Sequence, residues 1–498
     1  MTKMKNIGGL DIGTTGCKLS VYREDGEFVC NKYIEYDVTR QGGAHEVDAE
    51  MIFSAVCEVI GEVCSKYEVS AIGVTSFGET FVALDKDGKA LLPAMLYTDP
   101  RGAEECRSLC DTLGEDRITE ISGAKPHSMY SIAKILWLKK NRPDIWEQVA
   151  RITLVVDYVI YRLTGVAQID YSLAARTGAL DIRNKCWSKE IFDVAGIDTS
   201  LMSTPVPTGT LAGSIKLELA KQLNILGDVK MVTVSHDQVA SAVGAGILTP
   251  GEAVDGTGTV ECITPLFDSI PENKDLYNDN YAVVPYVFDG TYVCYAFSFT
   301  GGATLKWFRD NFAGKFEDAE NIYAELDKSI PENPTGLLIL PHFAGAATPY
   351  MDSGSKAAIL GLTLETTAED IYKALMEGVT YEIMLNLERL AAAGIDPKQL
   401  YATGGGAKSD VWLQIKADIT NRPVTAMCAK EVGAAGSCML AGTAIGLYGD
   451  LREAAKVFVK ERITYTPDPA KATQYRKYYN AYRSVYNAVR PIVEEAGL

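Results

Sequence analysis

The sequence predicts an α/β protein whose two halves share one design. Short apolar segments typical of buried strands alternate with segments of helical periodicity, a mixture that favours α/β layers over all-α or all-β folds. Two turns rich in Gly and Thr begin at Gly13 and at Gly256, 243 positions apart in a chain of 498 residues. At roughly 100–200 residues per domain, this length predicts two large domains or three ordinary ones.

Each of the two turns is predicted to close a β-hairpin. Residues 7–13 form an apolar strand, and residues 17–22 alternate as its partner; residues 253–255 and 260–263 repeat the pattern. Bare backbone N–H groups in such a turn converge on an anion, and a neighbouring Asp can hold the metal ion of a polyphosphate. One turn of this kind is usually only a hairpin. Two of them, half a chain apart, indicate paired phosphate sites, with chance similarity as the alternative.

Further elements follow in alternation. The pattern predicts strands over 71–75, 231–234 and 337–340, and helices over 49–66, 132–140, 368–393 and 410–421. The Gly- and Pro-rich stretch at 244–251 is the expected boundary, which divides the chain into domains 1–246 and 247–465. Residues 466–498 are rich in Tyr at helical spacing and are expected to form a closing helix.

Composition and charge exclude several classes of protein. Hydrophobic residues make up 47% and charged residues 23%, as in soluble proteins with well-filled cores. A net charge of −17 argues against nucleic-acid or anionic-membrane partners. The eleven cysteines form no C-x-x-C pair, and Cys106 and Cys110 are interpreted as small helix residues and not as metal ligands. Free thiols and the lack of a long apolar segment predict a cytoplasmic protein.

Polar residues follow the predicted strand at 231–234 without a break. The carboxyl end of a strand in an α/β sheet is where ligands bind. There Asp237 would accept the proton of a substrate hydroxyl as that hydroxyl attacks phosphorus, and Gln238 would hydrogen-bond a neighbouring hydroxyl. Two alternatives stay open at this point: His236 as the base, and Asp237 as the N-cap of the helix that follows.

A run of three glycines, Gly404 to Gly406, precedes the helix expected from about residue 409. Without side chains, this backbone can lie against a flat ring or a phosphate at the start of the helix. The alternative is a flexible connection between a strand and a helix.

Together these motifs resemble the FGGY family of carbohydrate kinases, within the actin-like ATPase superfamily, over essentially the whole chain. The resemblance is carried by residues 10–15, 131–138, 235–238, 255–259, 300–303 and 404–418, and by Glu431 with Ala434 and Gly436. It implies an α/β fold of two RNase H-like domains, each with a mixed sheet and flanking helices, and an active site in the cleft between them. It also implies a sugar and ATP as substrates, with Mg²⁺.

The resemblance assigns roles to particular residues. Asp237 is the implied general base, and Asp11 and Asp237 are the implied carboxylates near Mg²⁺. Sugar-binding residues would be Phe77, Gly78, Glu79, Asp99, Arg101, Asp237 and Gln238. Nucleotide-binding residues would be Gly13, Thr14, Thr15, Lys18, Gly258, Thr259, Gly302, Lys306, Gly405, Gly406 and Asp410.

The acceptor is expected to be a ketose, with a pentulose such as xylulose as the first expectation. Glycerol kinases typically carry Arg-Glu where this chain has Gly78-Glu79, and the Met-His pair usual in xylulokinases is absent. Phe77-Gly78 is closer to kinases of deoxy-ketoses such as fuculose and rhamnulose, and a polyol (glycerol, erythritol) is a further alternative. We interpret Phe77 as an apolar wall and Glu79 and Asp99 as acceptors for sugar hydroxyls. A pair between Glu79 and Arg101 is the alternative for Glu79.

Two other classes are weighed against the kinase. An actin-like ATPase acting as a chaperone or filament subunit would share the phosphate hairpins, but such proteins need an appended domain that residues after 465 do not supply. A catalytically dead regulator is disfavoured by the intact Asp11, Asp237 and Gly404–Gly406. Family members are often dimers, so a homodimer is a further expectation.

Overall fold

The structure is a computed structural model that describes residues 4–272, 274–314, 321–428 and 431–498. The chain packs into two compact units. Unit 1 contains the residues up to Gly246 together with Ala282–Val293 and Glu431–Val459. Unit 2 contains Ile247–Tyr281, Cys294–Lys430 and Lys460–Leu498. The first unit therefore ends its main segment where the sequence placed a boundary, and it also takes in two segments from the second half of the chain.

Unit 1 contains one large sheet, shorter strands outside that sheet, and helices. Its strands are β1 (Asn6–Ile12), β2 (Gly16–Arg23), β3 (Phe28–Glu35), β4 (Thr39–Gln41), β5 (Ala44–Val47), β6 (Val69–Ser76), β7 (Phe81–Leu84), β8 (Ala94–Met95), β9 (Arg151–Leu154), β10 (Gln168–Asp170), β11 (Leu180–Asp181), β12 (Cys186–Trp187), β13 (Thr204–Val206), β14 (Thr210–Ser214), β15 (Lys230–His236) and β18 (Val283–Pro285). Its helices are α1 (Ala49–Cys64), α2 (Ala103–Leu113), α3 (Glu115–Ser122), α4 (Ser131–Asn141), α5 (Pro143–Trp146), α6 (Val155–Thr164), α7 (Tyr171–Ala175), α8 (Lys189–Ala195), α9 (Leu217–Gln222), α10 (Asp237–Gly244), α16 (Val432–Ala444) and α17 (Leu451–Phe458).

Unit 2 has its own sheet and its own helices. Its strands are β16 (Glu252–Thr257), β17 (Glu261–Phe267), β20 (Ala296–Ser298), β21 (Leu338–Leu340), β22 (Ala358–Leu360), β23 (Gln399–Gly404), β24 (Val424–Met427) and β25 (Glu461–Tyr465), and β19 (Tyr292–Cys294) spans the point where the chain passes from unit 1 to unit 2. Its helices are α11 (Asp275–Asn278), α12 (Gly302–Phe312), α13 (Ile322–Ser329), α14 (Ala368–Ala392), α15 (Asp410–Thr420), α18 (Pro469–Tyr482) and α19 (Val485–Glu495).

The two main sheets repeat one topology. In unit 1 the order is β14-β15-β6-β1-β2-β3, and in unit 2 the strands β25-β24-β23-β16-β17 follow the same order, with β20 beside β17. Strand directions also correspond, because three central strands are parallel in each sheet and the flanking pairs are antiparallel. The duplication inferred from two short turns is therefore present in the whole arrangement of the strands.

The elements predicted from periodicity are confirmed with small shifts at their ends. The two hairpins are β1–β2 and β16–β17, and the predicted helices are α1, α4, α14 and α15. The last segment forms two helices, α18 and α19, where a single closing helix was expected. Helix α18 ends at Tyr482, and Ser484 is the cap of α19.

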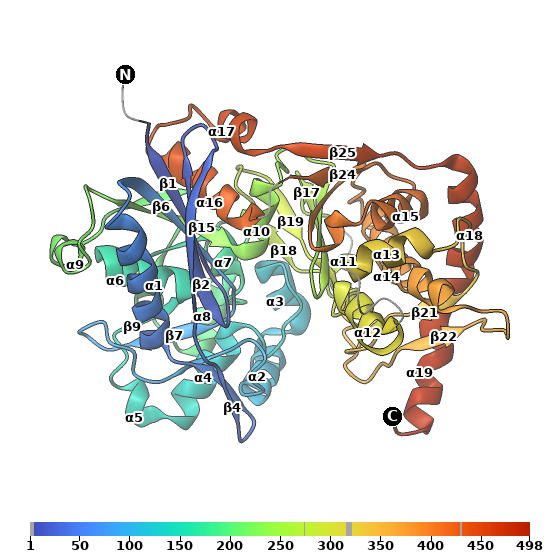
Figure 1. Cartoon of the computed structure of the whole chain (residues 1–498). Helices are drawn as coiled ribbons and strands as arrows, with labels where there is room; N and C mark the ends of the chain where they lie inside the picture. The colour runs from blue at the N-terminus through green and yellow to red at the C-terminus, as the bar shows by residue number, and fades with distance from the viewer. Residues whose placement is uncertain (1–3, 273, 315–320, 429–430) are drawn as a thin grey trace. The chain divides into compact units, whose positions relative to one another are not determined.

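Helix α16 packs closely enough on the sheet of unit 1 to require glycine at its contacts. A Cβ atom on Gly9 of β1 would lie 2.3 Å from the Ala434 carbonyl oxygen. Likewise, a Cβ on Gly244 of α10 would lie 1.8 Å from the carbonyl oxygen of Val432. Strand β1 and helix α16 come from opposite ends of the sequence, as their blue and red-orange colours in Figure 1 indicate. The helix therefore closes unit 1 and fixes the position of α10.

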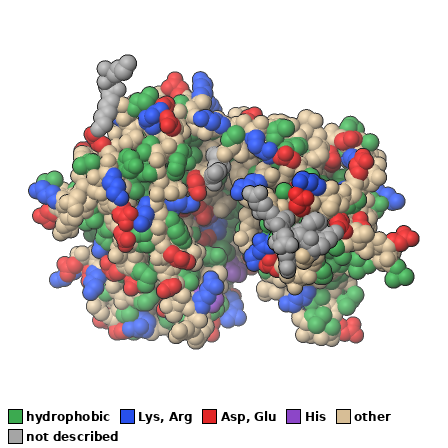
Figure 2. Space-filling model, in the orientation of Figure 1, with side chains coloured by type: hydrophobic (Ala, Val, Ile, Leu, Met, Phe, Trp, Pro, Cys, Tyr) green, Lys and Arg blue, Asp and Glu red, His purple; other side chains and the backbone are tan. Residues whose placement is uncertain are grey.

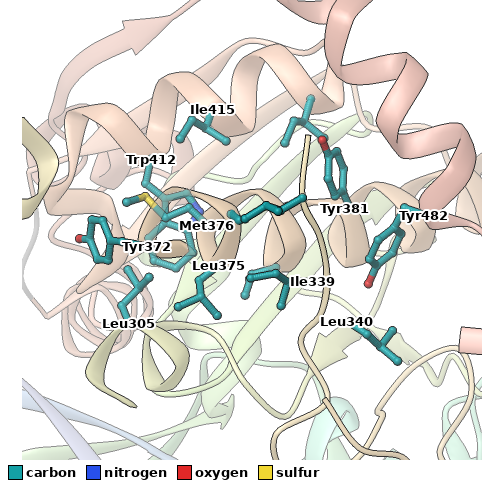
Figure 3. Packing of buried hydrophobic residues seen from close by; sticks show 14 of the residues in the cluster. Leu305, Ile339, Leu340, Tyr372, Leu375, Met376, Tyr381, Trp412, Ile415 and Tyr482 are labelled. Carbon is teal, nitrogen blue, oxygen red and sulfur yellow. The ribbon is translucent and has the colours of Figure 1, made fainter. Parts of the chain in front are cut away.

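The core of unit 2 surrounds the long helix α14. Figure 3 shows Tyr372 and Leu375 of this helix together with Leu305 of α12 and Trp412 of α15. Trp412 is 1% exposed, and its indole N–H donates to the Thr380 hydroxyl at 3.3 Å. Because α14, α12 and α15 share this core, the glycine turns that precede α12 and α15 are held on a rigid base.

Charged side chains of both signs are interspersed on the face shown in Figure 2. The net charge of −17 is therefore not gathered into one patch on that face. Among the residues that the structure describes, no helix is both long enough and apolar enough to cross a membrane.

Candidate active site

The first hairpin turn is held by a tyrosine of the neighbouring segment. The Gly13 amide donates to the Gly16 carbonyl at 2.8 Å, and the Tyr36 hydroxyl donates to the Gly13 carbonyl. A Cβ on Gly16 would overlap the outer end of the Tyr33 ring, which packs against this position. Thr15 is exposed at the tip of the turn, and its carbonyl accepts from the Tyr36 amide at 3.0 Å. The turn is thus rigid at its base and accessible at its tip.

Asp11 lies on β1 beside the turn, opposite Lys18 on β2. Burial and the charge of Asp237 raise the pKa of Asp11 to about 7, while Lys18 acts in the opposite direction. The Lys18 ammonium is shared with Glu431, whose carboxylate lies 2.7 Å away. The repulsion from Asp237 shows that Lys18 leaves Asp11 incompletely neutralised.

Asp237 is the first residue of α10, directly after β15. It does not cap the helix, because the cap position belongs to His236 and carries no side-chain hydrogen bond. The Oδ1 atom of Asp237 is buried without a hydrogen-bond partner. Burial raises the pKa of Asp237 to about 6, although Gln238 and the charge of Arg176 lower it. A carboxylate with a free buried oxygen and a pKa near neutrality can accept a proton at physiological pH.

His236, the alternative base, is held as a neutral ring. Its Nε2 lies 3.3 Å from Asp237 Oδ1, and its backbone N–H donates to the Ser172 hydroxyl at 3.0 Å. Burial and the charge of Arg176 lower the pKa of His236 to about 3. A group with so low a pKa is a weak base at neutral pH, so the environment favours Asp237 over His236 for this task.

The predicted sugar-binding segment lies beside α10 in unit 1. Phe77 is buried, and its amide donates to the Ile12 carbonyl at 3.3 Å, which ties the segment to the first hairpin. Glu79 is 4% exposed and has the left-handed backbone conformation, with φ of 61°. The Arg176 Nε donates to Glu79 Oε1 at 2.5 Å. The partner of Glu79 is therefore Arg176, and not Arg101 as the alternative held.

Arg101 instead pairs with Asp99. Its Nε lies 2.7 Å from Asp99 Oδ1, and its second terminal nitrogen lies 2.6 Å from Glu46. The His45 amide donates to Asp99 Oδ2 at 2.8 Å. Burial alone would raise the pKa of Asp99, but these hydrogen bonds outweigh it and hold the pKa below its usual range. Both oxygens of Asp99 therefore accept from the protein, whereas the Oδ1 atom of Asp237 accepts no hydrogen bond.

The second hairpin differs from the first in its chemistry. The Lys416 ammonium on α15 donates to Asp255, Thr257 and Glu261, each at 2.6 Å. Lys416 is 2% exposed, and both carboxylates are 0% exposed. Burial would lower the pKa of Lys416, but the charges of Asp255 and Glu261 outweigh it and raise the pKa. Asp255 is thus neutralised inside unit 2.

Three glycine turns of unit 2 meet around one cavity of about 780 Å³. The Gly302 amide donates to the Gly258 carbonyl at 2.8 Å, and a Cβ on Gly406 would lie 2.6 Å from Thr257. The cavity is lined by Gly258, Thr259, Gly302, Lys306, Gly405 and Gly406 from the predicted set, and by Trp307, Tyr323, Asp327, Tyr372, Ser409 and Trp412 among others. Glycine turns and aromatic rings in the lining of one cavity suit a molecule with phosphates and a flat base.

One residue that was predicted to bind the nucleotide does not line this cavity. Asp410, at the start of α15, pairs with Arg462 at 2.7 Å and does not line the cavity. Asp327 lines it instead, accepting from the Tyr372 hydroxyl at 3.0 Å and from the Ser409 hydroxyl at 2.7 Å. Burial raises the pKa of Asp327. The sequence carried no motif for Asp327, whereas Trp307 follows the predicted Lys306 directly.

The structure brings predicted residues together in two sets, one in each unit. Asp11, Phe77, Gly78, Glu79, Asp237 and Gln238 belong to unit 1, as do Gly13, Thr14, Thr15, Lys18, Asp99 and Arg101. Among the described residues, no group of three or more His, Cys, Asp or Glu side chains is arranged to hold a metal ion. Sequence reasoning missed Arg176, which donates to Glu79 and whose charge lowers the pKa of Asp237.

Comparison with known families covers most of the chain. The FGGY family of carbohydrate kinases matches residues 6–244 with its N-terminal domain and residues 266–445 with its C-terminal domain. The chain belongs to the FGGY family of carbohydrate kinases. This enzyme is therefore a sugar phosphotransferase of a family that uses ATP, and the resemblance inferred from its motifs is confirmed.

Individual relatives carry different names. The xylulose kinase of Bacillus subtilis (strain 168) is 28% identical over 98% of each chain. Among solved structures, a gluconate kinase from Lactobacillus acidophilus is 26% identical with a TM-score of 0.88, and a xylulose kinase from the same organism is 26% identical with a TM-score of 0.87. Each covers 98% of this kinase and is itself covered over 98%. The shared fold confirms the two-domain actin-like ATPase class.

Proposed function

We propose that this kinase transfers the γ-phosphoryl group of ATP to a hydroxyl of a ketose, of which a pentulose such as xylulose is the first candidate, with Asp237 as the general base. The observation that carries the proposal is the buried Oδ1 of Asp237, which has no hydrogen-bond partner and lies at the carboxyl end of β15. A hydroxyl in contact with that oxygen would lose its proton to it during attack on phosphorus. The similarity to xylulose kinases over nearly the full chain supports the choice of acceptor.

Unit 1 would take the acceptor. Phe77 would provide an apolar wall, while Glu79 and Gln238 would hydrogen-bond hydroxyls of the sugar. Asp99 and Arg101 would act by shaping the pocket, since they are already paired with each other. His236 would fill space beside the base as a neutral ring.

Unit 2 would take the nucleotide in its cavity of about 780 Å³. The turns at Gly258–Thr259, Gly302 and Gly405–Gly406 would face the phosphates, with Lys306 nearby. Trp307 and Tyr323 would contact the base. In unit 1, the turn at Gly13–Thr15 would supply amide groups to the transferred phosphoryl group.

Asp11 and Asp237 fit a divalent cation. The charge of Asp237 raises the pKa of Asp11, and Asp237 retains a buried oxygen without a hydrogen-bond partner. A bound cation would relieve both conditions. Mg²⁺ is commonly held by one or two carboxylates together with substrate phosphates. When bound, it would neutralise charge on the phosphates.

The test is ADP release with ATP and Mg²⁺ across xylulose, ribulose, fuculose, rhamnulose, gluconate, glycerol and erythritol. We expect one neutral ketose to stimulate release far above the rate without sugar. Asp237→Ala should abolish the stimulation while binding of ATP, measured by calorimetry, is retained. Uniform background across the panel, or near-normal turnover of Asp237→Ala, would contradict the proposal.

A further inference from the structure

Unit 2 contains a second cavity, of about 810 Å³, whose described lining includes none of the predicted site residues. It lies beside helices α15 and α18, which pack against one another (Figure 1). Its described lining shares no residue with that of the first cavity, which would take the nucleotide. On α15 the second cavity is bordered by Val411, Gln414, Ile415 and Asp418, whose spacing places them on one face of the helix. The two cavities are therefore separate, although both border α15.

Much of the wall of this second cavity is apolar. Its apolar residues come from the segment after α13, from α15 and from residues 467–475; they are Ile330, Pro331, Val411, Ile415, Pro467, Pro469 and Tyr475. A hydrocarbon group placed against them would be removed from water, which favours its binding. The wall therefore suits a ligand with an apolar body.

Both lysines in the lining are engaged by the segment that follows α13. Lys373 Nζ donates to the three carbonyls of residues 331–333 at 2.9, 3.3 and 2.8 Å, which uses all three donors of its ammonium group. Lys471 Nζ donates to two oxygens of the same segment at 3.0 and 2.9 Å. Each ammonium also has an acidic neighbour, Glu377 at 3.9 Å from Lys373 and Glu332 at 3.7 Å from Lys471. The cavity therefore offers little to an anionic ligand.

Asp418 is the carboxylate of this cavity that is least satisfied. It is 5% exposed, and its Oδ1 accepts from the Asp468 amide and from Gln414 Nε2, each at 2.8 Å. Among the described residues no group donates to its Oδ2, and neither Asp418 nor Asp468 forms an ion pair. Burial raises the pKa of Asp418, and the charge of Asp468 adds to that shift. One nearly inaccessible carboxylate oxygen thus lacks a partner in a cavity with an apolar wall.

The chemistry of this oxygen selects among ligands. A buried polar atom without a hydrogen bond costs free energy, and a cationic N–H group is the strongest donor that could satisfy it. An apolar ligand would leave Asp418 Oδ2 without a partner, and an anion would add a like charge beside Asp418 and Asp468. The net charge of −17 also attracts cations to the chain as a whole.

We propose that the second cavity is a binding site for a small organic ammonium cation with an apolar body, whose N–H groups donate to Asp418 Oδ2 beside Asp468. The site takes no part in the proposed phosphoryl transfer, so the inference goes beyond that function. A ligand bound there would contact α15, the helix whose Trp412 lines the first cavity.

The experiment measures the binding of three probes of similar shape to the full chain by calorimetry at neutral pH. The probes are cyclohexylmethylammonium, cyclohexylmethanol and cyclohexanecarboxylate, which carry a positive charge, no charge and a negative charge. Asp418→Asn replaces Oδ2 with an NH₂ group and keeps an oxygen that can accept from Gln414 and from the Asp468 amide. The matched control is Asp327→Asn, because Asp327 lines the first cavity and also accepts hydrogen bonds from the protein. Thermal unfolding shows whether each variant is folded.

We expect the ammonium probe to bind the wild type about tenfold or more tightly than the alcohol, because only the ammonium makes a charge-assisted hydrogen bond to Asp418. The carboxylate probe should give no detectable heat. Asp418→Asn should weaken binding of the ammonium probe by about tenfold or more and remove its advantage over the alcohol. Asp327→Asn should leave both affinities unchanged.

Equal affinities of the wild type for the ammonium probe and the alcohol would overturn the inference, as would the lack of any binding of the ammonium probe at millimolar concentrations. An unchanged affinity in folded Asp418→Asn would also overturn it. A loss of affinity in Asp327→Asn, with none in Asp418→Asn, would place the cation in the first cavity and contradict the assignment. These measurements need no sugar and no turnover, so they are independent of the proposed kinase reaction.

Discussion

The two hairpins have the same topology and opposite chemistry. Asp11 on β1 and Asp255 on β16 occupy corresponding strands, each between an antiparallel hairpin partner and a parallel neighbour. The Asp255 carboxylate lies 2.6 Å from the Lys416 ammonium. Lys18, which lies opposite Asp11, forms its ion pair with Glu431. One carboxylate thus stabilises its unit, and the other is left incompletely neutralised.

This difference shows how a duplicated fold can divide its tasks. In unit 2 the Lys416 ammonium donates to Asp255, and glycine turns of the same unit border a cavity. In unit 1 burial and the charge of Asp237 raise the pKa of Asp11, and perturbed pKa values of this kind are typical of catalytic sites. The same strands therefore support a nucleotide cavity in one unit and acid–base chemistry in the other, under the proposed function.

The largest expected effect concerns the catalytic side of the comparison. Replacing Asp237 with Ala removes the proton acceptor, and kcat should fall by about 10²–10⁴-fold. The free energy of unfolding should change little or rise, because the Oδ1 atom of Asp237 is buried without a hydrogen-bond partner. Steady-state kinetics and urea unfolding measure the two quantities, and near-normal kcat would assign the base elsewhere.

The next effect concerns the structural side. Lys416→Met leaves Asp255 and Glu261 buried without their cation, and the free energy of unfolding should fall by about 3–5 kcal/mol. Lys416→Arg, which keeps the charge, serves as the control for charge against shape. A loss below about 1 kcal/mol in Lys416→Met would mean that the cluster is not what neutralises Asp255.

The pH dependence of turnover sharpens the comparison further. Because the pKa of Asp237 is raised to about 6 and the base must be ionised, kcat/KM should fall as the pH drops through about 6. The limb should disappear from the residual activity of Asp237→Ala. A profile that is flat between about pH 5 and about pH 7 would contradict this assignment of the base.

The smallest expected effect comes from the Lys18–Glu431 ion pair of unit 1, which corresponds to the Lys416 cluster of unit 2. Lys18 and Glu431 are 27% and 33% exposed, so Glu431→Gln should change the free energy of unfolding by no more than about 1 kcal/mol. Chemical denaturation measures this change directly. A loss as large as that of Lys416→Met would remove the contrast between the two hairpins.

Sequence reasoning succeeded where the signal is local. The hairpins, the strand before Asp237 and the glycine run at 404–406 are each read from a few consecutive residues, and the structure places them as predicted. It could not identify partners that are distant in sequence. Lys416 is 161 residues from Asp255, Arg176 is 97 residues from Glu79, and Glu431 is 413 residues from Lys18.

Pairs of this kind arise from packing, which no local pattern encodes. Asp99 and Arg101 illustrate the converse, since two candidate site residues only two positions apart pair with each other. Helix α16 is a larger example: its glycine contacts with β1 and α10 return a late segment to unit 1, although the sequence divides the chain only near residue 246. The roles of individual site residues remain proposals that the variants above test.

The most direct test of the central claim is the same substitution at the two corresponding positions. Ionised Asp11 opposes folding as the pH rises from about 4 to about 7, because its folded-state pKa lies above that of an exposed carboxyl. At pH 8, Asp11→Asn should therefore keep or raise the Tm while turnover is lost. Asp255→Asn should lower the Tm markedly, because Lys416 loses a buried counterion. A lower Tm for Asp11→Asn than for Asp255→Asn would contradict the account.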